Sequence, residues 1–401
     1  MLLKKVALII CLVALMSLIC NFGYADQFKL TPTIGAREAY TDNLFFDTQN
    51  EIDDYITTIF GGVALLNRTE RLDLNLSAKL DGLLYADHDD LDDVEQFYNA
   101  NIGYRITERM RLAANGGYSD TSRPDRDIET TGLVFTGVKR KRWQGGVSGD
   151  VTLSELSALS LSYAYLQDKF DKPEYVDYKY HTVNLGYTHD FSKILPRVIG
   201  RINAGYNHYT SDELDLENIY ATVGFSRDIT ELFNILIDAG YRYSASEFKV
   251  PVFVPYPPFL ITTSDTEYDS GFNGEVVVGY TGETTRANIS VSQRLDPASG
   301  YNGTSNRTSF AFNIRHRFAD KFSANFYATY YLNKADAGQL AVNTIDQETV
   351  SIRPSLSYEI IDNLVLTASY TYTQVKYKTN DAEAKRNRVF VQLSYGIPLF
   401  E

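Results

Sequence analysis

Cysteine, methionine and tryptophan are scarce in this chain of 401 residues, which holds two, three and one of them respectively. Both cysteines, Cys11 and Cys20, lie within the first 25 residues. Beyond that point the chain has no thiol. This excludes a disulfide scaffold, a cysteine–metal site, a thiol nucleophile and covalent haem attachment in the remaining 26–401 segment.

Long hydrophobic runs are missing after the N-terminus as well. Charged residues make up 22% of the chain, and no later stretch offers the roughly 20 apolar residues that a membrane-spanning helix needs. A helical membrane protein is therefore excluded. The formal net charge of −13 also makes the chain a poor non-specific binder of nucleic acid, and we expect no nucleic-acid partner.

The first 25 residues have the pattern of an export signal. Lys4 and Lys5 precede an apolar stretch over residues 6–20, and the small residues Gly23 and Ala25 follow at positions suited to cleavage. The alternative, a membrane anchor, is weaker because the run is short for a span. We expect a cleaved signal peptide over residues 1–25 and a single domain over residues 26–401.

What the chain has in abundance is tyrosine, 30 residues against 22 phenylalanines, and an apolar–polar alternation of period two. Over residues 72–81 leucine and alanine alternate with aspartate, asparagine, serine and lysine, and residues 310–318 and 389–399 alternate similarly. Such strands suit a soluble sandwich or a membrane barrel. The barrel is favoured because the apolar positions carry no charge in the clearest segments, the other positions are polar, and tyrosines gather toward strand ends.

Short and long connectors alternate along the chain, as they do in outer-membrane barrels. Reading this alternation predicts an all-β fold, a transmembrane antiparallel up-and-down β-barrel of about 18 strands (range 16–20). One region breaks this alternation of short and long connectors. Merging residues 132–138 and 142–153 into one long strand restores it. Pro354 lies inside a predicted strand, where its missing N–H predicts a bulge.

If the apolar positions face lipid, the opposite positions line the pore. This alternation predicts pore-lining positions occupied by arginine or by acidic residues: Arg105, Arg111, Arg142, Arg201, Arg242, Arg286, Arg294, Arg315, Arg317, Arg353, Arg388, Asp73, Asp81, Asp150, Asp238, Glu275 and Glu359. The arginines could favour anionic or polyhydroxylated solutes. Alternatively, they pair with carboxylates across strands and only hydrate the wall.

Two predicted outer loops have unusual compositions. The first carries a dense acidic cluster that could weakly share divalent cations, although it lacks the glycine and the terminal glutamate of a calcium loop: Asp87, Asp89, Asp90, Asp92 and Asp93. The second, residues 247–269, holds four prolines that argue against a regular strand. It could fold into the mouth as a constriction, pack on a partner, or remain a plain loop.

Catalytic signals are weak. His181 and His208 fall on the apolar positions near strand ends, where histidine is more often interfacial than catalytic, and no nucleophile stands at a supporting spacing. A barrel hydrolase is thus a remote alternative. We expect no enzyme activity, no cofactor and no metal site of conventional spacing.

Residues 36–45, which read Ala-Arg-Glu-Ala-Tyr-Thr-Asp-Asn-Leu-Phe, and the following Asp53-Asp54-Tyr55-Ile56 resemble a family of Gram-negative barrels. These are the β-barrel porins found near exopolysaccharide and exosortase (PEP-CTERM) systems. The resemblance implies a cell outer-membrane pore linked to polysaccharide export and brings no catalytic residues. It also implies polysaccharide-export components as partners. The apolar face, the acidic outer loops and the C-terminal segment further predict outer-membrane lipid, lipopolysaccharide and the barrel-assembly machinery as partners.

Taken together, the sequence predicts a passive porin-like pore for small, anionic or polyhydroxylated solutes. A second hypothesis is an occluded structural barrel that holds a polysaccharide-export or electron-transfer assembly. Conductance in planar bilayers separates the two, since an open pore carries current and an occluded scaffold does not.

Overall fold

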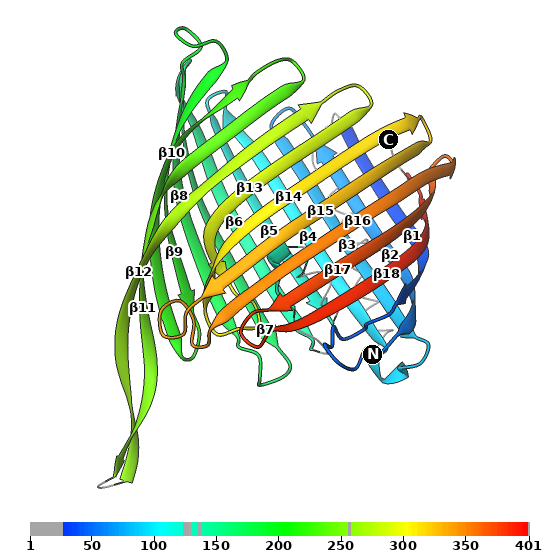
Figure 1. Cartoon of the computed structure of the whole chain (residues 1–401). Coiled ribbons are helices and arrows are strands. Elements are labelled where there is room, and N and C mark those ends of the chain that lie inside the picture. Colours follow the sequence, from blue (N-terminus) through cyan, green and yellow to red (C-terminus); the bar gives the residue numbers. More distant parts are fainter. Residues whose placement is uncertain (1–26, 123–127, 129, 135–137, 256–257, 400–401) are drawn as a thin grey trace.

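The computed structural model describes residues 27–122, 128, 130–134, 138–255 and 258–399, which form an 18-stranded antiparallel sheet. Each strand pairs with its neighbours in chain order, and β1 pairs with β18, so the sheet closes into a barrel (Figure 1). This confirms the predicted fold class and strand number. The predicted signal peptide lies outside the described residues.

The strands have these bounds: β1 (Gln27–Thr41), β2 (Asp54–Arg68), β3 (Leu72–Tyr85), β4 (Asp93–Thr107), β5 (Met110–Thr121), β6 (Arg140–Ser154), β7 (Ser157–Phe170), β8 (Tyr178–Asp190), β9 (Val198–Thr210), β10 (Leu214–Asp228), β11 (Phe233–Pro255), β12 (Pro258–Thr281), β13 (Thr285–Pro297), β14 (Thr304–Ala319), β15 (Phe322–Ala335), β16 (Ile345–Ile361), β17 (Leu364–Tyr377) and β18 (Ala382–Gly396). A 3-10 turn, η1 (Asp89–Leu91), lies between β3 and β4. No helix among the described residues is long and apolar enough to cross a membrane.

Residues of the predicted family motif secure the closure between β1 and β18. Asp42 accepts hydrogen bonds from the backbone N–H and the side-chain amide of Asn387, at 2.7 and 2.6 Å. The fully buried Asn43 donates to the carbonyl oxygen of Lys385 at 3.0 Å. Because an open sheet edge leaves a row of unpaired backbone groups, these contacts at the end of the last ladder help hold the barrel shut.

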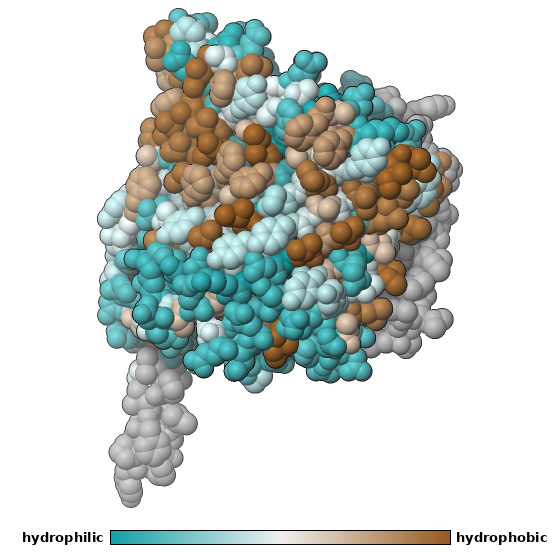
Figure 2. Space-filling view, turned by 45° about the vertical axis from the view of Figure 1, so that its right-hand side comes forward, coloured by the Kyte–Doolittle hydropathy of each residue, from teal (hydrophilic) through white to brown (hydrophobic). Residues whose placement is uncertain are grey.

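The two faces of the sheet differ in chemistry. Antiparallel partners directly opposite each other point to the same side, and the register can be followed from strand to strand around the barrel, with shifts only next to four of the short turns. The outward face carries exposed aliphatic side chains such as Ile59, Ile202 and Val223, which are 60%, 53% and 65% exposed. Figure 2 shows such hydrophobic side chains gathered on the half of the barrel away from the projecting β11–β12 hairpin, and a hydrophilic zone nearer to it.

The predicted merger of residues 132–138 with 142–153 is wrong. β6 begins at Arg140, and the preceding residues belong to a connection that leaves the wall. Gly132 has a φ of 69°, which ends any extended chain at that point. Leu133 and Val134 are buried inside the barrel. The shared alternation of the two segments reflected burial in a loop core instead of a common strand.

The Pro-rich segment is also different from the prediction. Residues 247–255 and 258–269 form neither a plain loop nor an inward constriction, because β11 and β12 continue as paired strands beyond the barrel (Figure 1); residues 256–257 lie outside the described residues. Pro251 pairs with Thr262, and Pro255 with Pro258. Among the described residues, the pairing of β10 with β11 ends at Phe248 and that of β13 with β12 at Gly274, so these prolines lie on strands paired along one edge, where a missing N–H is tolerated.

Pro354 produces no bulge. The β16–β17 pairing omits Arg353 and Pro354 and resumes in the same register, with Ile352 opposite Tyr372 and Ser355 opposite Ser369. The hydroxyl of Ser369 donates to the Pro354 carbonyl oxygen at 3.0 Å, which satisfies a backbone acceptor next to the interruption. The predicted bulge is therefore absent, and a side-chain hydrogen bond from Ser369 takes the place of a backbone hydrogen bond at this point.

Candidate functional site: the lumen and its plug

The connection between β5 and β6 crosses the inside of the barrel. The Gly132 carbonyl oxygen accepts hydrogen bonds from the Gln347 amide at 2.8 Å and from the Thr349 hydroxyl. The Asn333 amide donates to the carbonyl oxygen of Thr131 at 2.9 Å. These partners stand on β15 and β16, about halfway around the ring from β5 and β6. The connection is therefore a plug across the lumen, and the face bearing Asn333, Gln347 and Thr349 is the inner face.

Only glycine fits at the tip of this crossing. A Cβ atom on Gly132 would lie 2.3 Å from the Cβ atom of Tyr331, and the positive φ of Gly132 is itself unfavourable for other residues. The close approach lets the Gly132 carbonyl reach the inner face of β16. This role is not visible in the sequence, because glycine inside an alternating run resembles a strand residue.

An apolar core fills part of the end where the long connections lie. It contains buried residues from the plug, from β8–β11, β13, β15 and β16, and from the connections that follow β13 and β15: Leu133, Tyr178, Tyr209, Leu214, Leu216, Phe248, Leu295, Ala298, Ala335, Leu340, Ala341 and Ile345. Tyr301 packs against this core, and burial raises its pKa to about 12. Several connections that are far apart in the sequence thus pack together as one unit inside the mouth of the barrel.

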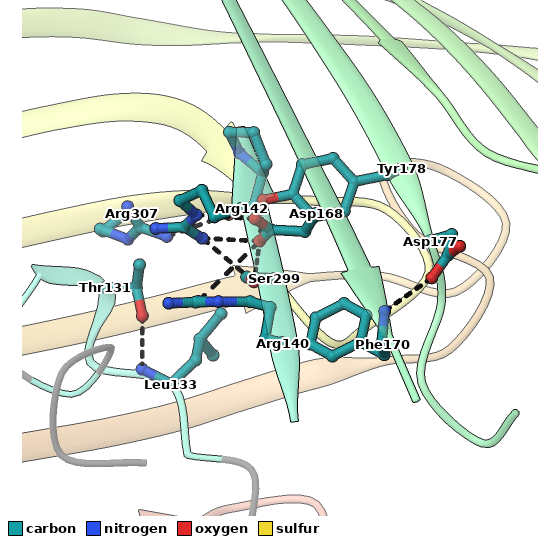
Figure 3. A network of polar contacts seen from close by, with 11 residues as sticks. Thr131, Leu133, Arg140, Arg142, Asp168, Phe170, Asp177, Tyr178, Ser299 and Arg307 are labelled. Carbon is teal, nitrogen blue, oxygen red and sulfur yellow. Dashed lines mark hydrogen bonds and ion pairs between the residues drawn. The ribbon is translucent and has the colours of Figure 1, made fainter. Parts of the chain in front are cut away.

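A buried polar network anchors this unit to the wall (Figure 3). Asp168 on β7 is fully buried and receives two hydrogen bonds from the Arg142 guanidinium, both of 2.6 Å. The hydroxyls of Ser299 and Tyr178 donate to the same carboxylate at 2.6 and 2.9 Å. Ser299 belongs to the β13–β14 connection, so Asp168 joins that loop to β6, β7 and β8.

The register places all seventeen predicted pore-lining residues on the inner face. Directly opposed pairs on that face include Arg111 with Asp150, Asp238 with Glu275, and Arg286 with Arg315. The predicted residues do not converge on one site. They are distributed around the wall and along its height, and they differ in how their charges are balanced.

Several wall arginines are neutralised by carboxylates. Ion pairs join Arg142 to Asp168 at 2.6 Å, Arg201 to Asp238 at 3.1 Å, Arg242 to Asp269 at 2.7 Å and Arg294 to Asp296 at 2.8 Å. Among the predicted acids, Asp73 pairs with Arg68 at 3.3 Å and Asp81 with Lys79 at 2.8 Å. Arg353 lies over the Tyr327 ring, 5.3 Å from its centroid. Contacts with neighbouring side chains of the wall therefore explain why these arginines and aspartates occur on the inner face.

Five other arginines on the inner face form no ion pair within the described part of the chain: Arg105, Arg111, Arg286, Arg315 and Arg317. All five lie near the end of the barrel where the short turns are. Arg286 and Arg315 stand directly opposite each other on β13 and β14. Like charges directly opposite each other destabilise a strand pair, so a contribution to the stability of the wall does not explain why Arg286 and Arg315 are arginines.

Three of these arginines line one cavity. Arg286, Arg315 and Arg317, with the carboxylates of Glu283, Asp320 and Glu359, surround a space of about 400 Å³. A separate cavity of about 390 Å³ lies against the inner face of β7–β13 and is lined mainly by serine, threonine, asparagine, tyrosine and ion-paired residues. Both spaces offer hydrogen-bond donors and acceptors to a hydrated or polyhydroxylated molecule.

Arg388 lies at the other end of the barrel. With Arg386, Lys139 and Asp92 it lines a pocket of about 190 Å³ between the plug and the β1–β3 wall. Aliphatic and aromatic side chains of the neighbouring loops complete this pocket. Arg388 is thus part of the loop end and is separate from the arginine group at the short-turn end.

The acidic loop is folded into local contacts. Asp93 pairs with Lys139 at 2.5 Å, and Asp92 accepts the backbone N–H of Tyr85 at 2.8 Å. Asp89 and Asp90 form the first turn of η1. Across the described ranges, no group of three histidine, cysteine or acidic side chains is arranged to hold a metal ion.

The two predicted histidines lie together on the outward face. The rings of His181 and His208 stack with their centroids 6.2 Å apart. His208 also contacts the Asp215 carboxylate at 2.5 Å and the Thr210 hydroxyl at 3.3 Å. Tyr163 and Tyr165 pack beside His181. The geometry is that of an aromatic group on the outer wall.

No protein-family model and no curated protein matches this sequence. Several solved barrels are similar in structure. The copper transporter OprC aligns with a TM-score of 0.46 and 11% identity over 89% of this chain, which spans 65% of the transporter. OccK2 (OpdF) of Pseudomonas aeruginosa aligns with a TM-score of 0.46 and 8% identity over 94% of this chain and 100% of its own. OccAB4 of Acinetobacter baumannii gives 0.44 and 12% over 93% and 99%.

Proposed function

We propose that this protein is a passive pore of the cell outer membrane for small anionic or polyhydroxylated solutes. Every strand pairs with both of its neighbours, so most backbone groups of the closed wall bond to one another, which is what a hydrocarbon environment demands of a sheet. Its aliphatic outward face and charged inner face match the alternation of membrane barrels. An exported, signal-bearing precursor and assembly by the barrel-assembly machinery belong to the same proposal.

The observation that carries the solute preference is the group of Arg286, Arg315 and Arg317. These guanidinium groups line a cavity of about 400 Å³ and form no ion pair in the described structure. Unpaired guanidinium groups bind carboxylate or phosphate oxygens in two-pronged geometry. The nearby carboxylates of Glu283, Asp320 and Glu359 add acceptors for hydroxyl groups, which suits sugars and sugar acids.

The direct test replaces two of these charges. In planar bilayers under a salt gradient, Arg315→Glu with Arg317→Glu should shift the reversal potential toward cations, because the lumen field changes sign locally. Arg227→Glu is the matched control, since Arg227 lies on the outward face of β10 near the same end of the barrel. An unchanged reversal potential in the double variant rejects a charge filter at this cavity.

A second candidate function is an occluded scaffold. It is favoured by the apolar core in the mouth, where Leu133, Leu295 and Leu340 are almost fully buried. Such a barrel would hold a polysaccharide-export or electron-transfer assembly without conducting. Absence of single-channel current from correctly folded protein would support the scaffold over the pore.

The link to exopolysaccharide export rests on the resemblance of residues 36–45 and 53–56. Two of these residues have a structural role here, because Asp42 and Asn43 secure the β1–β18 closure. A sequence motif that closes the barrel does not specify which solute passes through it. If a strain lacking this protein secretes the same amount of polysaccharide, the link is rejected while the pore proposal stands.

A further inference from the structure

The barrel wall has an unfinished seam between β12 and β13. β12 pairs with β11 along its whole length, but it pairs with β13 only from Gly274 to Thr281. Beyond that point β13 turns into the mouth, where Leu295 packs in the apolar core with Tyr178 and Tyr209. Within the described residues, the second edge of β12 over residues 264–273 therefore has no partner strand.

This edge is accessible to another molecule. Residues 264–268 are exposed on both faces of the strand, and Tyr268 is 60% exposed. Figure 1 shows the β11–β12 hairpin standing away from the barrel. A strand edge with free N–H and C=O groups is a template for strand addition, in which a partner segment extends the sheet by backbone hydrogen bonds.

The side chains beside the edge differ between the two faces. Asp265, Glu267 and Asp269 share the face of Ser244 and Ser246, which is the inner side. Asp269 is neutralised by Arg242 at 2.7 Å, whereas Asp265 and Glu267 form no ion pair with any described residue. The sequence from 263 to 273 contains no lysine or arginine. The inner side of the edge is thus negative.

The opposite face carries aromatic rings. Tyr268 stacks on Tyr243 with ring centroids 5.8 Å apart, and Phe272 is exposed next to it on the same side. A second copy of this edge is an unsuitable occupant, because antiparallel self-pairing would bring two acidic rows together, and like charges across a strand pair are unfavourable. A positively charged, amphipathic strand is complementary to both faces.

We propose that residues 264–273 of β12 bind an extended segment of a partner protein by strand addition. The segment carries lysine or arginine at alternate positions, with aliphatic residues between them. Its cations face Asp265 and Glu267, and its aliphatic side chains cover Tyr268 and Phe272. The backbone bonds supply affinity, and the alternating side chains set which segments bind.

The test uses the full-length protein in detergent micelles and a short synthetic peptide in which lysine alternates with valine. We expect saturable binding and slower amide hydrogen exchange confined to residues 264–273. Asp265→Lys with Glu267→Lys should weaken binding about tenfold or more. The same variant should bind a peptide with glutamate in place of lysine. Glu247→Lys, on the aromatic face, is the matched control and should leave lysine selectivity in place.

Specific results overturn the proposal. An equally tight complex with a peptide methylated at its backbone nitrogens would show a purely ionic contact without strand addition. Failure of the peptide to bind protein that keeps its folded electrophoretic mobility also contradicts it. A Thr266→Cys variant that forms a disulfide between two copies would show that the edge is occupied by a second copy.

Discussion

At the scale of single residues, Asp168 has the most consequential position. Its buried carboxylate holds Arg142, Ser299 and Tyr178 at once, and Arg140 lies 3.9 Å away. Removing one partner of a buried ion pair leaves the other charge uncompensated. We predict that Asp168→Asn lowers the free energy of unfolding by about 3 to 5 kcal/mol. Urea unfolding in lipid vesicles, followed by tyrosine and tryptophan fluorescence, measures this loss.

Asp73→Asn is the matched control for this measurement. Asp73 pairs with Arg68 at 3.3 Å, and both side chains are about half exposed. Exposed ion pairs contribute about 1 kcal/mol or less. Equal destabilisation by the two substitutions would contradict the role given to the buried network.

At the scale of elements, two connections differ from what their sequences predict. The composition of the Pro-rich segment leaves a constriction, a partner contact and a plain loop open, whereas in the structure this segment extends β11 and β12 outward as a hairpin. Residues 132–138 of the β5–β6 connection are predicted to belong to a strand, but this connection reaches across the lumen to Asn333 and Gln347. The plug assignment predicts that replacing residues 122–139 by a short glycine–serine turn raises single-channel conductance several-fold, because polar lumen is freed.

The control at this scale shortens the other element. Removing residues 249–262 trims the projecting hairpin, which contributes no strand to the closed wall beyond Phe248. Conductance should remain at the level of the intact protein. If trimming the hairpin raises conductance and replacing the β5–β6 connection does not, the assignment of the plug is wrong.

At the scale of the whole molecule, the outward face determines the surroundings. Leu161, Ile202 and Val223 are more than half exposed, together with many other aliphatic and aromatic side chains. Contiguous apolar surface of this extent is not stable in water. We predict that the folded chain is monodisperse only in detergent or lipid, as measured by light scattering across a detergent dilution. A monodisperse folded protein without detergent would reject the membrane proposal.

The sequence by itself determined the periodic features. A period of two fixes which side chains share a face, so the lumen positions from Asp73 to Arg388 followed from alternation alone. The number of strands followed from the alternation of short and long connectors. Even the acidic edge of β12 is visible as Asp265, Glu267 and Asp269 at every second position.

Only the tertiary structure decided what depends on contacts between distant segments. Leu133 alternates as a strand residue does, yet it is buried in a loop core because Gly132 turns the chain toward β16. Arg142 and Arg315 look alike in sequence, but one meets Asp168 and the other faces Arg286. Local alternation reports the side of the sheet on which a residue lies. Whether its charge is balanced there depends on neighbours that folding brings from elsewhere in the chain.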